Sequence, residues 1–139
     1  MRVLIDTNVL ADLLLGRAPY YDIANDIFTL CANKIIYGYI AAHSVPNLFY
    51  ILRTSMTKEE RRHVLKDICQ IVQVEDIDFV KILSALNNEE FHDFEDCLQE
   101  ECAIAVSADF IITRNLKDFS ASRVPAISPD EFIKKYKYI

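Results

Sequence analysis

A short apolar run that ends in an acid constrains the fold of this chain more than any other feature. Val3, Leu4 and Ile5 form the run, Asp6 ends it, and a helical pattern follows at once. A run bounded in this way is typical of a buried parallel strand that passes directly into a helix. In an open α/β sheet, this strand places Asp6 and Asn8 at the carboxyl edge, where such folds bind their ligands.

The residues after this strand have a purely structural explanation as well. Asp, Thr and Asn are preferred at the N-cap of a helix, so Asp6-Thr7-Asn8 could serve only to begin the helix. Acidic residues further along the chain favour the functional explanation.

Strand-like and helix-like segments alternate along the chain. The strand patterns cover residues 2–5, 35–40, 71–74, 110–113 and 124–127. The helix patterns cover residues 7–14, 20–32, 43–54, 57–69, 76–86 and 93–106, and a last helix begins near Pro129. This alternation predicts a three-layer α/β/α fold with a central, mainly parallel sheet. No repeat or linker divides the chain, so residues 1–139 are expected to form a single domain.

Composition indicates a globular protein of a reducing compartment. Hydrophobic residues make up 52% of the chain and charged residues 26%, which excludes a disordered chain. The four cysteines contain no Cys-x-x-Cys pair, which favours reduced core thiols over a structural zinc site. They are Cys31, Cys69, Cys97 and Cys102. We therefore expect a cytoplasmic location.

One segment has the length of a membrane span. Residues 35–52 contain no Asp, Glu, Lys or Arg, and 18 residues is about the lower limit for a spanning helix. Gly38 and the polar stretch His43-Ser44-Val45-Pro46-Asn47 instead predict a strand, a turn and a helix. Asp6 interrupts the only apolar run near the amino terminus, so no signal peptide is expected. The sequence predicts a protein that does not enter a membrane.

The negative charge is concentrated in one part of the chain. The net charge is −6, and residues 75–109 alone carry 11 acidic side chains and one basic side chain. An acidic chain is poorly suited to passive nucleic-acid binding, which depends on basic contacts to phosphate. The acidic segment is therefore either a solvated surface or a cation site.

Two later segments carry acids that could contribute to a site. On a helix, Asp93, Asp96 and Glu100 fall on one stripe, although acids at a helix start also complement the helix dipole. The loop after the fourth strand, residues 113–119, contains Asp118, and its alternative explanation is an ordinary polar loop.

The joint arrangement of these acids favours a cation site. Asp6 and Asp118 each follow a buried strand, and the helix with Asp96 comes just before the second of these strands. The carboxyl ends of parallel strands can converge on one crevice. Clustered carboxylates are tolerated only with raised pKa values or a bound cation. Oxygen ligands suit Mg²⁺ or Mn²⁺, and such a metal can promote phosphodiester cleavage.

Three segments of the sequence resemble a PIN domain. They are Val-Leu-Ile-Asp-Thr-Asn-Val-Leu at residues 3–10, Asp-Phe-Glu-Asp at 93–96 and Ile-Ile-Thr-Arg-Asn-Leu-Lys-Asp-Phe at 111–119. At this chain length, the resemblance is to the VapC-type toxins of prokaryotic toxin–antitoxin pairs. It implies a PIN-like fold and a Mg²⁺- or Mn²⁺-dependent endoribonuclease, a hydrolase that acts on RNA phosphodiester bonds. It also implies a homodimer and a small antitoxin partner.

The resemblance assigns roles to individual residues. It implies that Asp6, Asp96 and Asp118 are catalytic and bind the metal, with Asp93 as an accessory metal-binding acid. The polar supporting residues are Asn8, Asn47, Thr113 and Asn115. Arg114 and Lys117 lie close to Asp118 in the sequence, and we expect them to contact RNA phosphate.

One position departs from the pattern of the family. Asn47 occupies the place where the family usually has an acid, most often Glu. An amide oxygen can bind a metal but brings no charge, so the affinity for a cation should fall. The alternative hypothesis is therefore a non-catalytic PIN-fold module that binds nucleic acid or protein. The nearby His43 is expected to be a surface or capping residue and not a ligand.

Overall fold

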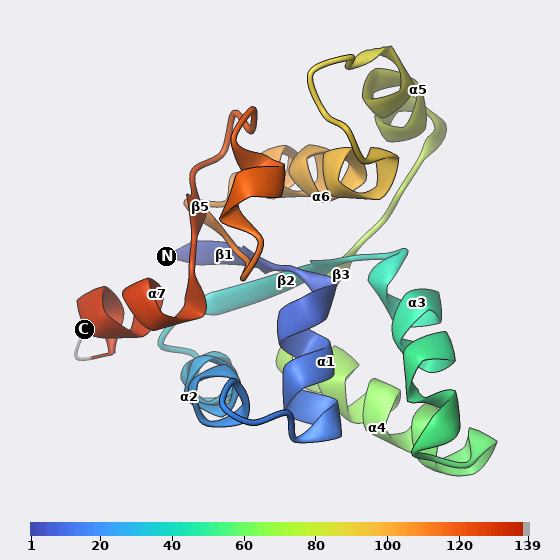
Figure 1. The fold of residues 1–139 in the computed structure, drawn as a ribbon, viewed down its shortest axis with the longest axis vertical. Coiled ribbons are helices and arrows are strands. Elements are labelled where there is room, and N and C mark those ends of the chain that lie inside the picture. The colour runs from blue at the N-terminus through green and yellow to red at the C-terminus, as the bar shows by residue number, and fades with distance from the viewer. Residues whose placement is uncertain (138–139) are drawn as a thin grey trace.

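The computed structural model describes residues 1–137. Within these residues, parallel strands form one five-stranded sheet in the order β3-β2-β1-β4-β5, and helices cover both of its faces (Figure 1). The strands are β1 (Arg2–Ile5), β2 (Tyr37–Ala41), β3 (Gln73–Glu75), β4 (Phe110–Ile112) and β5 (Ala126–Ile127). The three-layer α/β/α fold predicted from the sequence is confirmed.

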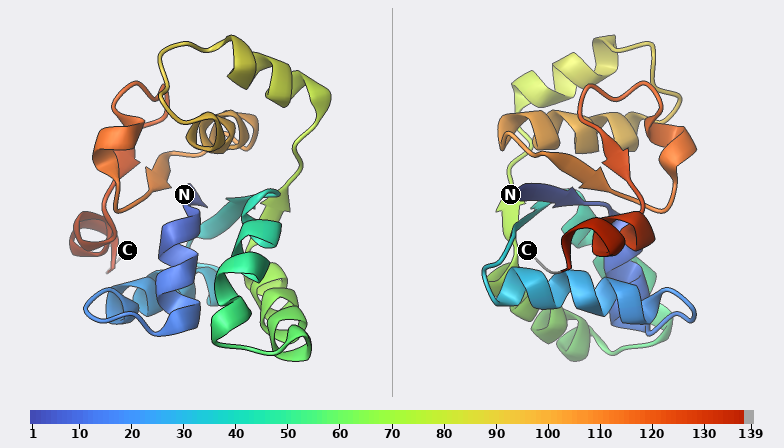
Figure 2. Two further views of the ribbon diagram at one scale, coloured as in Figure 1. Left: turned by 45° about the vertical axis from the view of Figure 1, so that its right-hand side comes forward. Right: turned by 90° about the vertical axis from the view of Figure 1, so that its left-hand side faces the viewer.

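Helices occupy most of the connections between strands. The α-helices are α1 (Thr7–Leu15), α2 (Tyr21–Ala32), α3 (Ser44–Ile51), α4 (Lys58–Ile71), α5 (Phe79–Asn87), α6 (Phe94–Ala105) and α7 (Pro129–Tyr136). Two short 3-10 segments are η1 (Leu52–Thr54) and η2 (Leu116–Phe119). The helices α1, α2, α3, α4 and α7 lie on one face of the sheet, and α5, α6 and η2 lie on the other (Figures 1 and 2).

The central strand β1 contributes side chains to both layers. Val3 and Ile5 pack into the larger hydrophobic cluster, whereas Leu4 packs into the cluster under α6. Alternation between the two faces is the ordinary geometry of a strand, and all three side chains are fully buried. The continuous apolar run thus reflects a strand that is covered on both faces, as the sequence predicted.

Side-chain caps set several helix starts, and one predicted start is wrong. The sequence Thr57-Lys58-Glu59-Glu60 has the pattern of a capping box, and Thr57 and Glu60 form one at the start of α4. The helix α5 begins at Phe79 and not near Asp76, because Asp78 accepts a hydrogen bond from the backbone N–H of Lys81. The predicted helix over residues 43–54 is divided into α3 and η1.

The segment 35–52 forms the predicted strand, turn and helix, β2 and α3. Among residues 1–137, no helix combines the length and the apolar composition needed to cross a membrane.

The cysteine prediction is correct at three positions and wrong at one. Cys31, Cys97 and Cys102 are buried, and burial raises the pKa of each thiol well above its ordinary value. Cys69 is exposed, because it lies on the outward side of the amphipathic helix α4.

A glycine in β2 allows α2 and α4 to approach the sheet closely. A Cβ atom at Gly38 would lie 2.7 Å from Cys31 Sγ and 2.9 Å from Val72 Cγ1, distances that real contacts essentially never reach. We expect Gly38→Ala to lower the free energy of unfolding by about 1–3 kcal/mol, because a packed core cannot absorb an added methyl group without strain. Chemical denaturation measures this loss.

A double variant tests the cause of the expected loss at Gly38. Cys31→Ala removes the nearest atom, so Gly38→Ala combined with Cys31→Ala should lose less stability than the sum of the two single variants. Simple additivity would contradict the steric explanation.

Candidate active site

The carboxyl end of β1 opens onto a cavity. β1 lies between β2 and β4, and the chain runs from β1 to α1 below the sheet and reaches β4 from α6 above it (Figure 2). Open α/β sheets bind ligands at such a topological switch point, where connections from neighbouring strands pass to opposite faces of the sheet. The cavity has a volume of about 430 Å³, and we call it the acidic cavity. Its lining residues are Asp6, Thr7, Asn8, Ala11, Arg17, His43, Asn47, Tyr50, Ile51, Glu95, Asp96, Gln99 and Asn115.

The carboxylate of Asp6 is the most tightly held group of the acidic cavity. Only 6% of Asp6 is exposed. Its oxygens accept hydrogen bonds from the backbone N–H of Thr7 at 2.7 Å, Asn8 Nδ2 at 3.1 Å and Thr113 Oγ1 at 2.7 Å. Gln99 Nε2 adds a longer contact of 3.4 Å. These four donors come from α1, α6 and the end of β4, so the fold fixes the position of this carboxylate.

Burial and neighbouring charges oppose these hydrogen bonds in their effect on Asp6. Burial raises the pKa of Asp6 above its ordinary value, and the negative charge of Asp118 raises it further. The hydrogen bonds from Thr113 and Thr7 and the positive charge of Arg114 lower it, but they do not offset the burial.

Asp96 shares the acidic cavity with Asp6. It lies in the first turn of α6 and is half-buried. Burial first, and then the negative charges of Asp6, Asp93 and Asp118, raise the pKa of Asp96 to about 7. With this pKa, Asp96 is partly protonated near neutral pH unless positive charge enters the cavity.

The other two predicted acids lie at the periphery of this pair. Asp93 is exposed and caps α6, since its carboxylate accepts a hydrogen bond from the backbone N–H of Asp96 at 3.0 Å. Asp118 is exposed in η2 and is not among the lining residues. Within residues 1–137, no three His, Cys, Asp or Glu side chains are clustered tightly enough to form a metal site by themselves. The structure therefore brings Asp6 and Asp96 together, and Asp93 and Asp118 act on them through their charge.

Glu100 does not belong to the acidic face that the helical stripe predicted. It is fully buried, and its carboxylate pairs with the guanidinium of Arg123, with a shortest contact of 2.6 Å. It also accepts a hydrogen bond from the backbone N–H of Arg123 at 2.7 Å. The prediction was wrong because α6 is buried over a wide arc, and a residue on the connection from β4 to β5 neutralises Glu100.

Gln99 is a residue of the site that the sequence did not indicate. It is 2% exposed, and its Nε2 lies 3.4 Å from Asp6 Oδ1, 3.2 Å from Thr7 Oγ1 and 3.3 Å from Ser44 Oγ. It therefore ties α6 to the starts of α1 and α3. Its position three residues after Asp96 placed both on one helix face, and this spacing was the available signal.

Helix α3 contributes Asn47, Tyr50 and Ile51 to the acidic cavity, and His43 at its N-cap also lines it. His43 was expected to be a surface or capping residue. Burial lowers the pKa of His43, and its Nδ1 is buried without a hydrogen-bond partner in the described part of the chain. The four-residue spacing of His43 and Asn47 explains their common face.

The predicted phosphate contacts occupy different environments. Arg114 Nε and Nη2 donate to the two carboxylate oxygens of Asp12 at 2.7 and 3.1 Å. Lys117 is exposed in η2. Arg17 lines the acidic cavity and lies 3.6 Å from the same Asp12 carboxylate. Asn115 also lines the cavity, and its backbone N–H donates to Thr113 Oγ1 at 3.0 Å.

Comparison with known proteins identifies a family. The PIN domain family matches residues 2–117, which is most of the chain. No curated protein matches the chain.

Solved structures of toxin–antitoxin systems have a similar fold. A chain of VapBC2 from Rickettsia felis, bound to a DNA fragment from their promoter, is 20% identical with a TM-score of 0.69; the match covers 92% of this chain and 98% of that one. A chain of a toxin–antitoxin complex from Klebsiella pneumoniae is 22% identical with a TM-score of 0.66, and the match covers 91% and 97%. The sarcin–ricin-loop-cleaving toxin VapC20 from Mycobacterium tuberculosis is 16% identical with a TM-score of 0.61, and the match covers 78% and 86%. At these identities the likeness shows a shared fold.

Burial of Asp96, together with repulsion from its acidic neighbours, should make stability depend on pH in a defined direction. The pKa of Asp96 is raised from 3.8 to about 7 in the folded chain, so its ionisation costs folding free energy. This cost is absent below the unfolded pKa, grows as the pH rises toward 7, and is complete above it. Asp96→Asn removes the cost. In EDTA, we expect the free energy of unfolding of this variant relative to the wild type to rise between about pH 4 and 7, by about 2 kcal/mol for this half-buried group.

Chemical denaturation at a series of pH values measures this difference. Asp76→Asn, on an exposed acid outside the cavity, is the matched control. An equal rise in the control, or no rise in Asp96→Asn, would contradict the raised pKa of Asp96 as the cause.

Proposed function

The chain belongs to the PIN domain family, and from this premise we propose that it is a divalent-metal-dependent endoribonuclease of the toxin–antitoxin type. The observation that supports the proposal most strongly is the pair of carboxylates Asp6 and Asp96 in one cavity at the carboxyl edge of the sheet. Burial, and then the negative charges of Asp6, Asp93 and Asp118, raise the pKa of Asp96, and a bound cation would relieve the repulsion among these acids.

The donors of the acidic cavity fit Mg²⁺ or Mn²⁺. Both ions prefer oxygen ligands, and Mg²⁺ in proteins is often held by one or two carboxylates, with waters and substrate phosphate completing the shell. Asp6 and Asp96 would hold the ion, with Asp118 and Asp93 adding negative charge. Buried acceptor atoms without a described partner, Asn8 Oδ1 and Gln99 Oε1, lie on residues of the same cavity. When bound, the ion would supply an activated water and charge neutralisation at the phosphate.

The residues of the chain have separable roles in this proposal. Thr113, Asn8 and Gln99 orient Asp6 through their hydrogen bonds. Such fixed neighbours keep a reacting group in position and cost no reorganisation during the reaction. Asn47 and Asn115 place polar amides on the wall of the cavity.

Basic residues around the acidic cavity would bind the RNA backbone. Arg17 lies on its wall, and Lys117 is exposed beside Asp118. Asp12 uses two of the five N–H donors of Arg114, so this guanidinium keeps donors for substrate. We propose phosphate contacts for Arg114 and Lys117, with Arg17 as a further contact.

The proposed partners follow from the complexes in which the similar chains were solved. The similar chains come from VapBC and other toxin–antitoxin complexes, which supports a small antitoxin as partner of this chain. We further propose that the substrate is RNA and that the chain forms a homodimer. We also propose that residues 1–139 form a single domain and that the protein is cytoplasmic.

Removal of the Asp6 charge tests the nuclease directly. We expect Asp6→Asn to lower metal-dependent cleavage of RNA by more than the roughly 100-fold that loss of a supporting group produces. The amide oxygen of the variant can keep the hydrogen bonds from Thr7 and Gln99, and the Thr113 hydroxyl can turn to accept from the new amide N–H, so the fold should persist. A panel of single-stranded and structured RNAs, with Mg²⁺ or Mn²⁺, measures the rate.

The matched control for this experiment is again Asp76→Asn, which should cleave at the wild-type rate. A folded Asp6→Asn protein that cleaves RNA normally would contradict the assigned role of Asp6.

Asn47 supports a second candidate function. The structure places this amide on the wall of the acidic cavity, where an acid would add charge for a cation. The alternative is a non-catalytic PIN-fold module that binds nucleic acid or protein. This module would bind divalent ions weakly and cleave no RNA even at high protein concentration.

A charge restored at position 47 distinguishes a cation cavity from a polar wall. We expect Asn47→Glu to tighten Mn²⁺ binding by about tenfold, because a nearby carboxylate attracts the ion across a partly buried cavity. Calorimetric titration measures the affinity. Asn25→Glu adds the same charge on an exposed position of α2 and serves as control. Unchanged affinity in Asn47→Glu would show that position 47 is not part of a cation site.

A further inference from the structure

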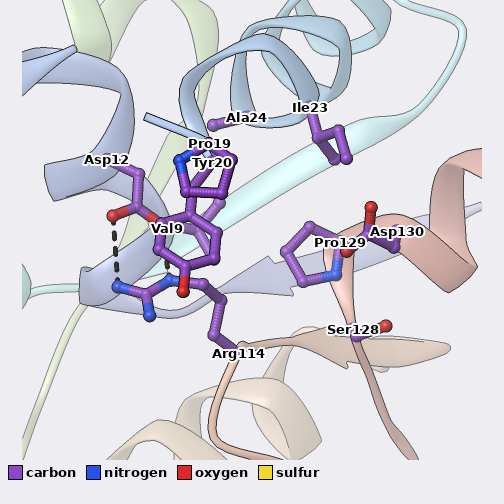
Figure 3. A pocket seen from close by; sticks show the side chains of 10 residues that line it. All are labelled: Val9, Asp12, Pro19, Tyr20, Ile23, Ala24, Arg114, Ser128, Pro129 and Asp130. Atoms are coloured by element: carbon purple, nitrogen blue, oxygen red, sulfur yellow. Dashed lines mark hydrogen bonds and ion pairs between the residues drawn. The ribbon is translucent and has the colours of Figure 1, made fainter. Parts of the chain in front are cut away.

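A second cavity lies beside the acidic cavity, and we call it the Tyr20 cavity. Its volume is about 440 Å³. Figure 3 shows Tyr20 and Arg114 on one side and Ser128 and Pro129, at the start of α7, on the other, with Ile23 of α2 above them. Among its lining residues, only Arg114 has been assigned a role so far.

A stacked pair of planar groups forms one side of the Tyr20 cavity. The guanidinium carbon of Arg114 lies 4.1 Å from the centre of the Tyr20 ring. The two hydrogen bonds from Arg114 to Asp12 fix the plane of the guanidinium (Figure 3), and Asp12 is only 1% exposed. A buried acid thus holds an arginine in position under the ring. Tyr20 itself remains 42% exposed, so a ligand can reach it.

The two cavities share a wall. Asp12 lines the Tyr20 cavity and contacts Arg17, which lines the acidic cavity. Arg114 lines the Tyr20 cavity, and the next residue, Asn115, lines the acidic cavity. Adjacent residues in a chain are about 3.8 Å apart. The linings of the two cavities therefore adjoin at Arg114–Asn115 and at the contact of Asp12 with Arg17.

The chemistry of the Tyr20 cavity suits a base better than a phosphate. Ile23 and Pro129 make part of its lining apolar, while Ser128 supplies a polar group. A base has apolar faces and a polar edge, and proteins bind unstacked bases on aromatic rings and guanidinium planes. Arg114 is the only cation among the lining residues, and the acids Asp12 and Asp130 also line the cavity, so a phosphate held inside it would gain little net attraction.

We propose that the Tyr20 cavity is a nucleobase subsite, which binds one unstacked base of single-stranded RNA next to the phosphate in the acidic cavity. This inference rests on the proposed function. The stack of Tyr20 on Arg114 supplies the platform for the base, and the buried Asp12 acts as a positioning residue that holds the platform.

A combination of protein and RNA changes tests the subsite. The protein is Asp6→Asn, so that RNA is bound and not cleaved, and the probe is a short single-stranded RNA of mixed sequence. A matched set of RNAs carries one abasic nucleotide at each position in turn. We expect Tyr20→Ala to weaken binding of the intact RNA by about tenfold, within the range for loss of one base–aromatic stack. One abasic position should weaken binding similarly with Tyr20 present and have no effect in Tyr20→Ala.

Two control variants separate stacking from general damage. Tyr20→Phe keeps the ring and should restore binding together with the sensitivity at that abasic position. Tyr21→Ala removes a neighbouring ring that is 40% exposed and is not among the residues lining the cavity, so binding should not change.

The outcomes distinguish failure of the subsite from failure of the nuclease. Additive effects at every abasic position, or no rescue by Tyr20→Phe, would overturn the subsite while wild-type cleavage of RNA upholds the proposed function. Absence of both cleavage by the wild type and binding by Asp6→Asn would overturn the proposed function and the subsite together.

Discussion

The buried carboxylate of Asp6 is the interaction on which the rest of the site depends. A carboxylate removed from water costs several kcal/mol unless hydrogen bonds replace its hydration. Asp6 meets this need with donors from the start of α1, from Thr113 after β4 and from Gln99 on α6. The carboxylate therefore joins three elements that are far apart in the sequence. The same contacts that permit its burial also place the site at the carboxyl edge of β1.

Repulsion among the acids shows that the acidic cavity is not arranged for stability alone. Burial, and then the charges of Asp6, Asp93 and Asp118, raise the pKa of Asp96 to about 7. Elsewhere in the fold, a buried acid is paired: Glu100 with Arg123 and Asp12 with Arg114. A fold that neutralises other buried acids but leaves this group unpaired has the character of a functional site, in which a ligand supplies the missing charge.

Buried acids also organise the basic residues around the site. Asp12 holds Arg114 under the Tyr20 ring and lies within 3.6 Å of Arg17. These contacts separate two neighbouring cavities of similar volume, about 430 and 440 Å³. In the proposed function, the acidic cavity holds a phosphate and the Tyr20 ring stacks a base, so that the two parts of a single-stranded polynucleotide are held separately.

Local sequence patterns determined the fold class and indicated Asp6 and Asp96, which line the acidic cavity. Tertiary contacts decided which other residues surround them. The apolar run ending in Asp6 and the capping box at Thr57 predicted their elements correctly, since periodicity and capping act between neighbours in the chain. The burial of Glu100 against Arg123 and the position of Gln99 beside Asp6 could not be predicted this way. A helix face shows which residues are adjacent on that helix, but the partner of each buried polar group comes from a distant segment, and only packing of the whole chain selects that partner.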